Sequence, residues 1–206
     1  NKYDDNIFFQ KYSQMSRSQQ GLAGAGEWET LRKLLPDFKD KRVLDLGCGY
    51  GWHCIYAMEH GASSVVGVDI SHKMLEVAKE KTHFPQVEYK CCAIEDVEFP
   101  EESFDVILSS LAFHYVADYE ILVKKIYRIL KSGGKLVFTV EHPVFTAYGT
   151  QDWHYNEKGE ILHFPVDNYY YEGKRTAVFL GEKVTKYHRT LTTYLNTLLS
   201  NGFIIN

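Results

Sequence analysis

The 206-residue sequence contains few cysteines and no long apolar run. Its four cysteines, Cys48, Cys54, Cys91 and Cys92, form no CxxC pair and show no disulfide-framework spacing, which argues against a cysteine metal site. No apolar run approaches the ~20 residues that a membrane-spanning helix needs. The first residues, 1–5, lack the apolar core of a signal peptide. These absences predict a cytoplasmic protein without a membrane span, whose cysteines are structural.

An excess of positive charge is also missing. The formal net charge is -4, which argues against a nucleic-acid partner, because phosphate backbones attract basic faces. The cluster Lys124, Lys125, Arg128 and Lys131 on one predicted helix is better explained as a solvated helix face. A hydrophobic content of 45% and the absence of internal repeats fit a single globular domain over residues 1–206.

Apolar runs alternate with helical patterns between residues 41 and 140. Strands are predicted at 42–46, 64–69, 87–91, 104–109 and 135–140. Helices are predicted at 52–60, from a Ser71 cap to Lys81, and around Leu122, Ile126 and Leu130, ending before Gly133. This alternation predicts an α/β fold, a doubly wound and mostly parallel sheet with helices on both faces and ligands at the carboxyl ends of the strands.

The flanking segments show other patterns. Residues 1–35 have no strand pattern and carry an apolar stripe at Trp28, Leu31 and Leu34, so we expect a helical lid over the ligand site. Residues 141–189 are aromatic-rich, contain a predicted hairpin around Gly181, and are expected to form a substrate-side insertion. Residues 190–206 predict a last helix and the start of a strand near Phe203.

The segment from Val43 to Gly51, VLDLGCGYG, predicts a buried strand that turns tightly into a helix. Glycines reach positive φ and have no Cβ, so backbone N–H groups there can approach a ligand closely. The dinucleotide fingerprint G-x-G-x-x-G fails because Trp52 replaces its last glycine. Asp69 ends the second predicted strand and can accept hydrogen bonds from ribose hydroxyls, as in either kind of nucleotide site.

Five segments together resemble the class I S-adenosylmethionine-dependent methyltransferases, in their small-molecule branch. They occur in the family's order and spacing over about residues 41–140: VLDLGCGYG at 43–51, VDIS at 68–71, IEDVEFP at 94–100, SFDVI at 103–107 and LKSGG at 130–134. The resemblance implies S-adenosylmethionine as cofactor, no metal, and a seven-stranded type of sheet. Because only one more strand could begin near Phe203, we expect the C-terminal strands to be missing from this sequence.

The resemblance also implies roles for individual residues. Gly47 and Gly49 are expected to pass the methionine part of the cofactor, and Asp45 to orient the turn or the cofactor's amino group. The remaining implied positions are Asp69 at the ribose, Ile70 on the adenine, Ile94 and Glu95 at the adenine edge, and Ser109 at the methionine part through its backbone. Ala93 stands where the family often has a polar residue, which leaves open the group that recognises the adenine amine.

Methyl transfer from a sulfonium is an in-line displacement, which needs a base only if the acceptor must lose a proton. His114 and His142 follow the fourth and fifth predicted strands and are the candidate bases, although either is also compatible with a packed histidine. The candidates for substrate binding are Trp153, Tyr169, Tyr170 and His188, and the aromatic ones among them are equally compatible with packing inside the insertion.

A small organic acceptor is favoured, with oxygen or nitrogen as the acceptor atom left open. Nucleic-acid amino methyltransferases of this fold carry Asn/Asp-Pro-Pro-aromatic after the fourth strand, where this chain has Ser109-Ser110-Leu111-Ala112. The acids of a metal-assisted catechol enzyme are missing there as well. Two other functions stay open from the sequence: a non-catalytic S-adenosylmethionine-binding protein, and a nicotinamide-dependent oxidoreductase.

Overall fold

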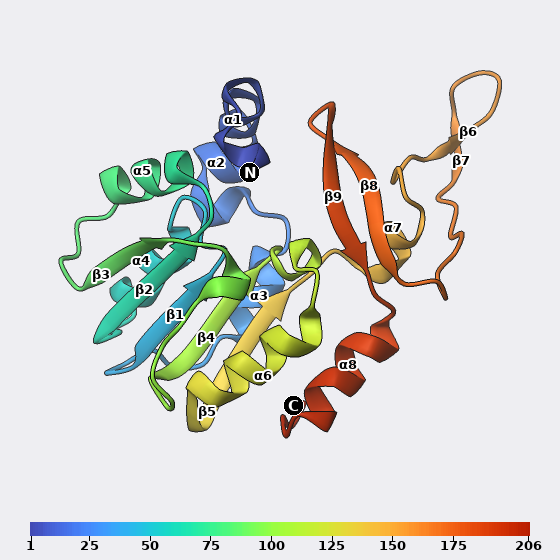
Figure 1. The fold of residues 1–206 in the computed structure, drawn as a ribbon. Coiled ribbons are helices and arrows are strands. Elements are labelled where there is room, and N and C mark those ends of the chain that lie inside the picture. Colours follow the sequence, from blue (N-terminus) through green and yellow to red (C-terminus); the bar gives the residue numbers. More distant parts are fainter.

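A computed structural model describes residues 1–206, which form a parallel five-stranded sheet with helices on both faces (Figure 1). The strand order is β3-β2-β1-β4-β5. The strands are β1 (Arg42–Leu46), β2 (Ser64–Asp69), β3 (Val87–Cys91), β4 (Phe104–Ser110) and β5 (Leu130–Thr139). The chain direction across the sheet reverses between β1 and β4, so the loops after these strands diverge and open a crevice, the usual ligand position in such sheets.

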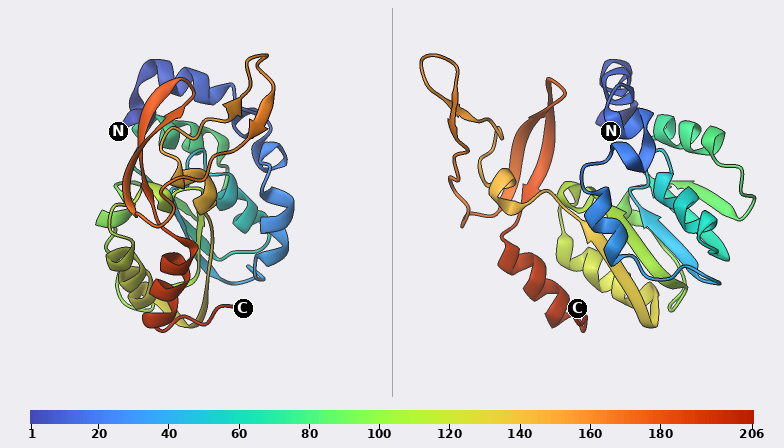
Figure 2. Two further views of the ribbon diagram at one scale, coloured as in Figure 1. Left: turned by 90° about the vertical axis from the view of Figure 1, so that its right-hand side faces the viewer. Right: turned by 180° about the vertical axis from the view of Figure 1, so that it is seen from behind.

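Each face of the sheet buries its own core. Alternate side chains of β1 point to opposite faces, so Leu44 and Leu46 join one cluster and Val43 joins the other. The first cluster includes the helices α6 (Tyr119–Ile129) and α8 (Leu191–Ser200). The second includes α4 (Trp52–Glu59) and α5 (His72–Lys81), and α3 (Trp28–Leu34) packs on α4 (Figure 2).

Most predicted elements are confirmed, although β5 spans Leu130–Thr139 where a strand was predicted at 135–140. The first three strands agree residue for residue, and Ser71 caps α5 by accepting from the Met74 backbone N–H at 3.2 Å. The helix predicted to include Leu130 ends at Ile129, because Leu130 is extended and pairs with Phe104 of β4.

One expectation about the end of the chain differs from the structure. No strand forms over residues 203–205, where Phe203 packs edge-on against Tyr127 of α6 and pairs with no strand. The central sheet has five parallel strands, which are the five strands predicted between residues 41 and 140.

The N-terminal residues 1–24 form a cover over the carboxyl ends of the strands. The cover contains η1 (Lys2–Asp4), α1 (Asn6–Ser13), α2 (Ser16–Gln19) and η2 (Gly21–Gly24), and it lies between α5 and the β9 strand in Figure 1. The predicted lid is therefore shorter than 1–35. Helix α3 packs beside the sheet instead, with Trp28 against Tyr56 of α4.

The predicted insertion contains two hairpins. The inner hairpin is β8 (Gly173–Phe179) with β9 (Glu182–His188), and its Ala177 and Val184 pack on Phe8 of the cover. The outer hairpin, β6 (His154–Tyr155) with β7 (Ile161–His163), projects away from the sheet (Figure 2). The short elements α7 (Pro143–Ala147), η3 (Ile94–Asp96) and η4 (Phe113–Tyr115) complete the fold. None of the helices has the length and apolarity required to span a membrane.

Candidate functional site

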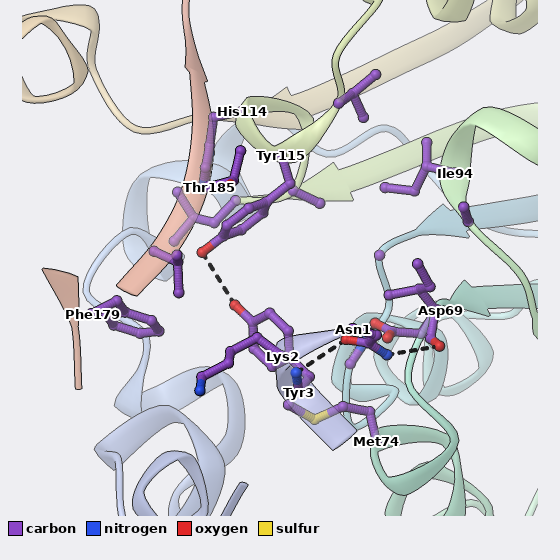
Figure 3. Close-up of a pocket in the computed structure, with 18 of the residues that line it drawn as sticks. Asn1, Lys2, Tyr3, Asp69, Met74, Ile94, His114, Tyr115, Phe179 and Thr185 are labelled. Atoms are coloured by element: carbon purple, nitrogen blue, oxygen red, sulfur yellow. Dashed lines mark hydrogen bonds between the residues drawn. The ribbon is translucent and has the colours of Figure 1, made fainter. Parts of the chain in front are cut away.

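A cavity of about 870 Å³ lies at the carboxyl ends of the strands, beneath the cover (Figure 3). Its volume falls within the range of about 300–1,000 Å³ of small-molecule sites. One end, called here the turn half, is lined by Gly47, Gly49, Asp69, Ile70, Met74, Ala93, Ile94, Glu95, Asp96 and Ala112. The other end, the hairpin half, is lined by Tyr3, His114, Tyr115, Val116, Glu141, Phe179, Lys183, Val184 and Thr185.

The glycine turn after β1 needs glycine for reasons of space and conformation. Gly47 has φ +80°, and a Cβ there would come within 2.5 Å of the Ala112 Cβ. Gly51 has φ +74°, and a Cβ there would come within 2.2 Å of the Tyr89 hydroxyl. A Cβ on Gly49 would meet nothing within 4 Å, which shows that the space beside this residue is open.

Asp69 is held rigidly at the edge of the cavity by the backbone. Its Oδ2 accepts from the Gly49 N–H and its Oδ1 accepts from the Ser71 N–H, both at 2.9 Å. Burial raises the pKa of Asp69, and these backbone donors oppose that shift. Each carboxylate oxygen keeps a second lone pair, which suits hydroxyl donors arriving from the cavity.

Asp45 lies beneath the turn and does not line the cavity. It is fully buried, its Oδ2 accepts from the Cys54 thiol at 3.5 Å, and its Oδ1 has no hydrogen-bond partner. Burial raises the pKa of Asp45 to about 7. Its contacts are therefore with α4, which supports the turn from behind.

His114 and Glu141 form the polar floor of the hairpin half. The Glu141 backbone N–H donates to His114 Nδ1 at 3.4 Å, and His114 Nε2 lies 4.0 Å from Glu141 Oε1. Burial lowers the pKa of His114 to about 4, so its imidazole is neutral at pH 7. Burial acts to raise the pKa of Glu141, but the Lys186 charge and the hydrogen bonds from Lys186 and Gln151 hold it below its ordinary value.

The family profile described as a methyltransferase domain matches residues 44–138, the core of the sheet. A Listeria monocytogenes protein, solved as a candidate S-adenosylmethionine-dependent methyltransferase, is 58% identical with a TM-score of 0.85, covering 88% of this chain and 85% of that one. An S-adenosylmethionine-dependent methyltransferase of Mesorhizobium loti is 41% identical with a TM-score of 0.83, covering 90% and 84%. This chain belongs to the S-adenosylmethionine-dependent methyltransferases.

An uncharacterised Haemophilus influenzae protein is 36% identical over 216 residues, which cover 98% of this chain and 83% of that protein. The family membership decides between the three hypotheses left open by the sequence. The chain is a methyltransferase enzyme, and S-adenosylmethionine is its methyl donor.

Most of the predicted cofactor residues line the turn half of the cavity in this methyltransferase. Gly47, Gly49, Asp69 and the pair Ile94-Glu95 line the cavity, as does Ile70, whose side chain is 49% exposed there. Met74 and Asp96 line it too, although the sequence analysis missed them.

Ser109 lies outside the cavity of the methyltransferase. Its Oγ donates to the Leu46 carbonyl at 2.8 Å, in the space between β4 and β1. Side chains alternate along a strand, so the next residue, Ser110, lines the cavity instead. The contact expected for Ser109 is made through its backbone, and it stays a prediction.

Two of the three predicted site histidines have other contacts. His142 is exposed, and its Nδ1 accepts from the Val144 N–H as the N-cap of α7. His188 is buried between Thr146 Oγ1 and the Tyr169 carbonyl, each 2.8 Å from one of its ring nitrogens. Neither histidine lines the cavity, which corrects the expectation that they act at the site.

The aromatic residues predicted to bind substrate also lie outside the cavity. Trp153 packs against Phe164 in the outer hairpin segment, and Tyr170 is 86% exposed. The Tyr169 hydroxyl accepts from the Leu191 N–H at 3.0 Å at the start of α8. These residues follow α7, where the chain leaves the sheet, and none of them lines the cavity.

The aromatic wall of the cavity comes instead from residues that the sequence analysis did not assign to the site. Tyr3 of the cover and Tyr115 of η4 point toward each other in Figure 3, with their hydroxyls 3.2 Å apart. Tyr12 and Phe179 line the same space. The aromatic-rich start of the chain was a signal that could have indicated Tyr3 and Tyr12.

A further ion pair borders the cavity next to the glycine turn. Arg17 of α2 contacts Glu27 at 2.7 Å, and Glu27 accepts from Ser110 Oγ at 3.2 Å. Arg17 lines both the main cavity and a small pocket of about 70 Å³ beside Gly49, which Glu27 also lines. The pair places one cation and one anion beside the glycine turn.

Proposed function

We propose that this methyltransferase transfers a methyl group to a small organic molecule bound in the hairpin half of the cavity. The observation that carries the proposal is the continuity of one cavity, from Asp69 and the glycine turn to His114 and Glu141. A donor at one end and an acceptor at the other would lie close together and aligned. Such positioning is worth up to ~7–11 kcal/mol in ideal intramolecular reactions.

The turn half fits the adenosine part of S-adenosylmethionine. When bound, this molecule supplies a methyl group that the positive charge on its sulfur makes electrophilic. The backbone-anchored carboxylate of Asp69 suits the ribose hydroxyls, and Ile70, Met74 and Ile94 offer apolar contact to an adenine ring. Glu95 lies at the same edge, where a carboxylate can accept from an adenine amine.

The Arg17–Glu27 pair fits the amino-acid end of the donor. An arginine guanidinium binds carboxylates through two parallel N–H donors, and a glutamate accepts from an ammonium group. Because Arg17 and Glu27 both border the space beside Gly49, the pair is complementary to an α-amino acid zwitterion. Glu27 then makes the contact with the cofactor's amino group, which was one of the two roles expected for Asp45.

The hairpin half is enclosed by the cover, the inner hairpin and η4, so its acceptor is a small molecule. The cover is attached on both sides: Asp4 accepts from Ser71 Oγ at 2.6 Å, and Lys2 contacts Glu182 at 3.0 Å. Exclusion of water from the space between these attachments keeps the reactive donor from hydrolysis. The net charge of -4 also favours a small acceptor over a nucleic acid.

The proposal is tested with donor carrying a labelled methyl group and a library of small hydroxyl and amino compounds. We expect label in at least one compound, and a 10- to 100-fold weaker affinity for S-adenosylhomocysteine in Asp69→Ala, since hydrogen bonds to a charged group are worth about 1.5–3 kcal/mol. The exposed Asp152→Ala serves as the control. Binding of the donor without label in any compound would contradict the proposed reaction.

A further inference from the structure

The tautomer of His114 is set by a hydrogen bond from the backbone of Glu141. The Glu141 backbone N–H donates to Nδ1, so Nδ1 is the acceptor nitrogen of the neutral ring and Nε2 carries the hydrogen. His114 is buried, with only 2% of its surface exposed, although it lines the cavity. It therefore presents a fixed N–H donor on the side of Nε2, and its other nitrogen is already engaged.

The Glu141 carboxylate is fixed as firmly from the other side. Lys186 of β9, which is almost completely buried, donates to Glu141 Oε1 at 2.5 Å, and Gln151 donates to Oε2 at 2.9 Å. Lys186 also donates to the Gln151 side-chain oxygen at 2.8 Å. Gln151 has φ +63°, an uncommon conformation for a residue other than glycine, and such strain gathers at functional sites.

A gap separates these two groups at the cavity wall. His114 Nε2 and Glu141 Oε1 are 4.0 Å apart, too far for a direct hydrogen bond, and both residues line the hairpin half. The gap therefore offers a donor and an acceptor to the same visiting atom. An atom that satisfies both must accept one hydrogen bond and donate another.

We propose that the methyl acceptor of this enzyme is a hydroxyl oxygen that bridges His114 Nε2 and Glu141 Oε1, with Glu141 as the proton acceptor. This inference rests on the proposed function. A hydroxyl oxygen has two lone pairs, so it can accept from His114, donate to Glu141 and still direct a lone pair at the methyl group. A neutral amine nitrogen has a single lone pair, which attack on the methyl group would take away from His114.

The step balances without any further reagent. The oxygen–hydrogen bond breaks as its proton passes to the Glu141 carboxylate, while an oxygen–carbon bond forms to the methyl group. The sulfur–carbon bond breaks, and its electron pair leaves with the sulfur as a neutral thioether. The proton on Glu141 returns to solvent after the product leaves.

The surroundings of Glu141 narrow the class of hydroxyl. Lys186 and Gln151 stabilise the carboxylate form, and the pKa of Glu141 is lowered. A weak base removes a proton more readily from a more acidic hydroxyl, which favours phenols and enols over alkyl alcohols. The aromatic walls of Tyr3, Tyr115 and Phe179 fit a flat, conjugated ring of this class.

Matched pairs of acceptors test the inference. The purified enzyme is supplied with labelled donor and with 1-naphthol against 1-naphthylamine, catechol against 1,2-diaminobenzene, and a bacterial small-molecule extract, and the products are identified by mass spectrometry. We expect O-methyl products, with the amino member of a pair at least tenfold slower. N-, S- or C-methyl products would overturn the inference and leave the proposed function standing. No labelled product from any source would contradict the proposed function itself.

Variants of the carboxylate distinguish proton transfer from structural support. Glu141→Gln should lower kcat at least 100-fold with an S-adenosylhomocysteine affinity within threefold of the parent, and Glu141→Asp should restore part of the rate. The exposed Glu157→Gln should leave the rate unchanged. If E141Q unfolds because it leaves Lys186 buried without its partner, the test is repeated with the E141Q/K186M variant, in which both charges are removed. A rate in either Gln variant within threefold of the parent would overturn the role of Glu141.

Discussion

Asp45 belongs to the glycine-turn motif, but its buried position directs its carboxyl away from the cavity. The residue interrupts the apolar run before the glycine turn, where it was expected to orient either the turn or the cofactor's amino group. Its carboxyl instead faces Cys54 of α4, fully buried, with one oxygen unpaired. Burial favours the protonated form and raises the pKa of Asp45 to about 7.

This shift predicts a pH-dependent stability that belongs to Asp45. The pKa of Asp45 is higher in the folded protein than in the unfolded chain, so its contribution is full below about pH 4 and is lost as the pH rises to about 7. Relative to Asp45→Asn, the parent should lose about 1–3 kcal/mol of unfolding free energy between pH 5 and pH 8. Denaturant titrations of both proteins at these two pH values measure the difference. A difference that does not change with pH would contradict a protonated Asp45.

The residues that sequence reasoning found and missed differ in how their positions are determined. Gly47, Gly49 and Asp69 follow strand ends directly, so local pattern and the rule for parallel sheets place them. Glu141 and His142 both follow β5, yet Glu141 faces the cavity and His142 caps α7. Beyond the end of a strand, two neighbouring residues can point in different directions. The alternating pattern of the strand has ended there, so the sequence does not indicate which of the two faces the cavity.

At the scale of elements, the cover is attached to the core through the start of α5. Asp4 accepts from Ser71 Oγ at 2.6 Å and from the Lys73 N–H at 3.2 Å, and Asn1 donates to the Ile70 carbonyl at 2.9 Å. A carboxylate at a helix N-terminus also interacts favourably with the helix dipole. These contacts lie beside Ile70 and Asp69. The cover is therefore attached at the same end of β2 where we propose that the donor binds.

Loss of this attachment should loosen the cover and weaken donor binding together. We expect Asp4→Ala to raise the Kd for S-adenosylhomocysteine about 3- to 10-fold, which corresponds to ~1 kcal/mol. Hydrogen exchange should become faster over residues 1–13 and stay unchanged in β1 and β4. The exposed Asp152→Ala is the matched control. Unchanged affinity and unchanged exchange in Asp4→Ala would show that the contact does not hold the cover.

The insertion shows why its site residues were difficult to predict. The sequence correctly indicated a hairpin around Gly181, but it could not show which residues of the insertion face the sheet. The inner hairpin packs on Phe8 of the cover, a contact between segments about 170 residues apart. The outer hairpin makes its own local contacts, such as Trp153 with Phe164, and lies away from the cavity.

At the scale of the whole molecule, the parallel sheet brings the ends of β1, β2, β4 and β5 to one edge, and the two flanking segments enclose the space above it. The sheet and the turn half of the site were predictable because their motifs are local and their order is that of the chain. The hairpin half was not, because Tyr3, Tyr115 and Glu141 meet only through tertiary packing. Recognition of the acceptor therefore depends on the part of the fold with the weakest sequence signal.

The central claim is that one cavity holds the donor in its turn half and leaves its hairpin half for the acceptor. A crystal structure of the enzyme with S-adenosylhomocysteine tests it most directly. We predict the ribose hydroxyls on Asp69, the amino-acid end beside the Arg17–Glu27 pair, and the sulfur facing the space in front of His114 and Glu141. A ligand that fills the hairpin half, or that binds away from Asp69, would contradict the account.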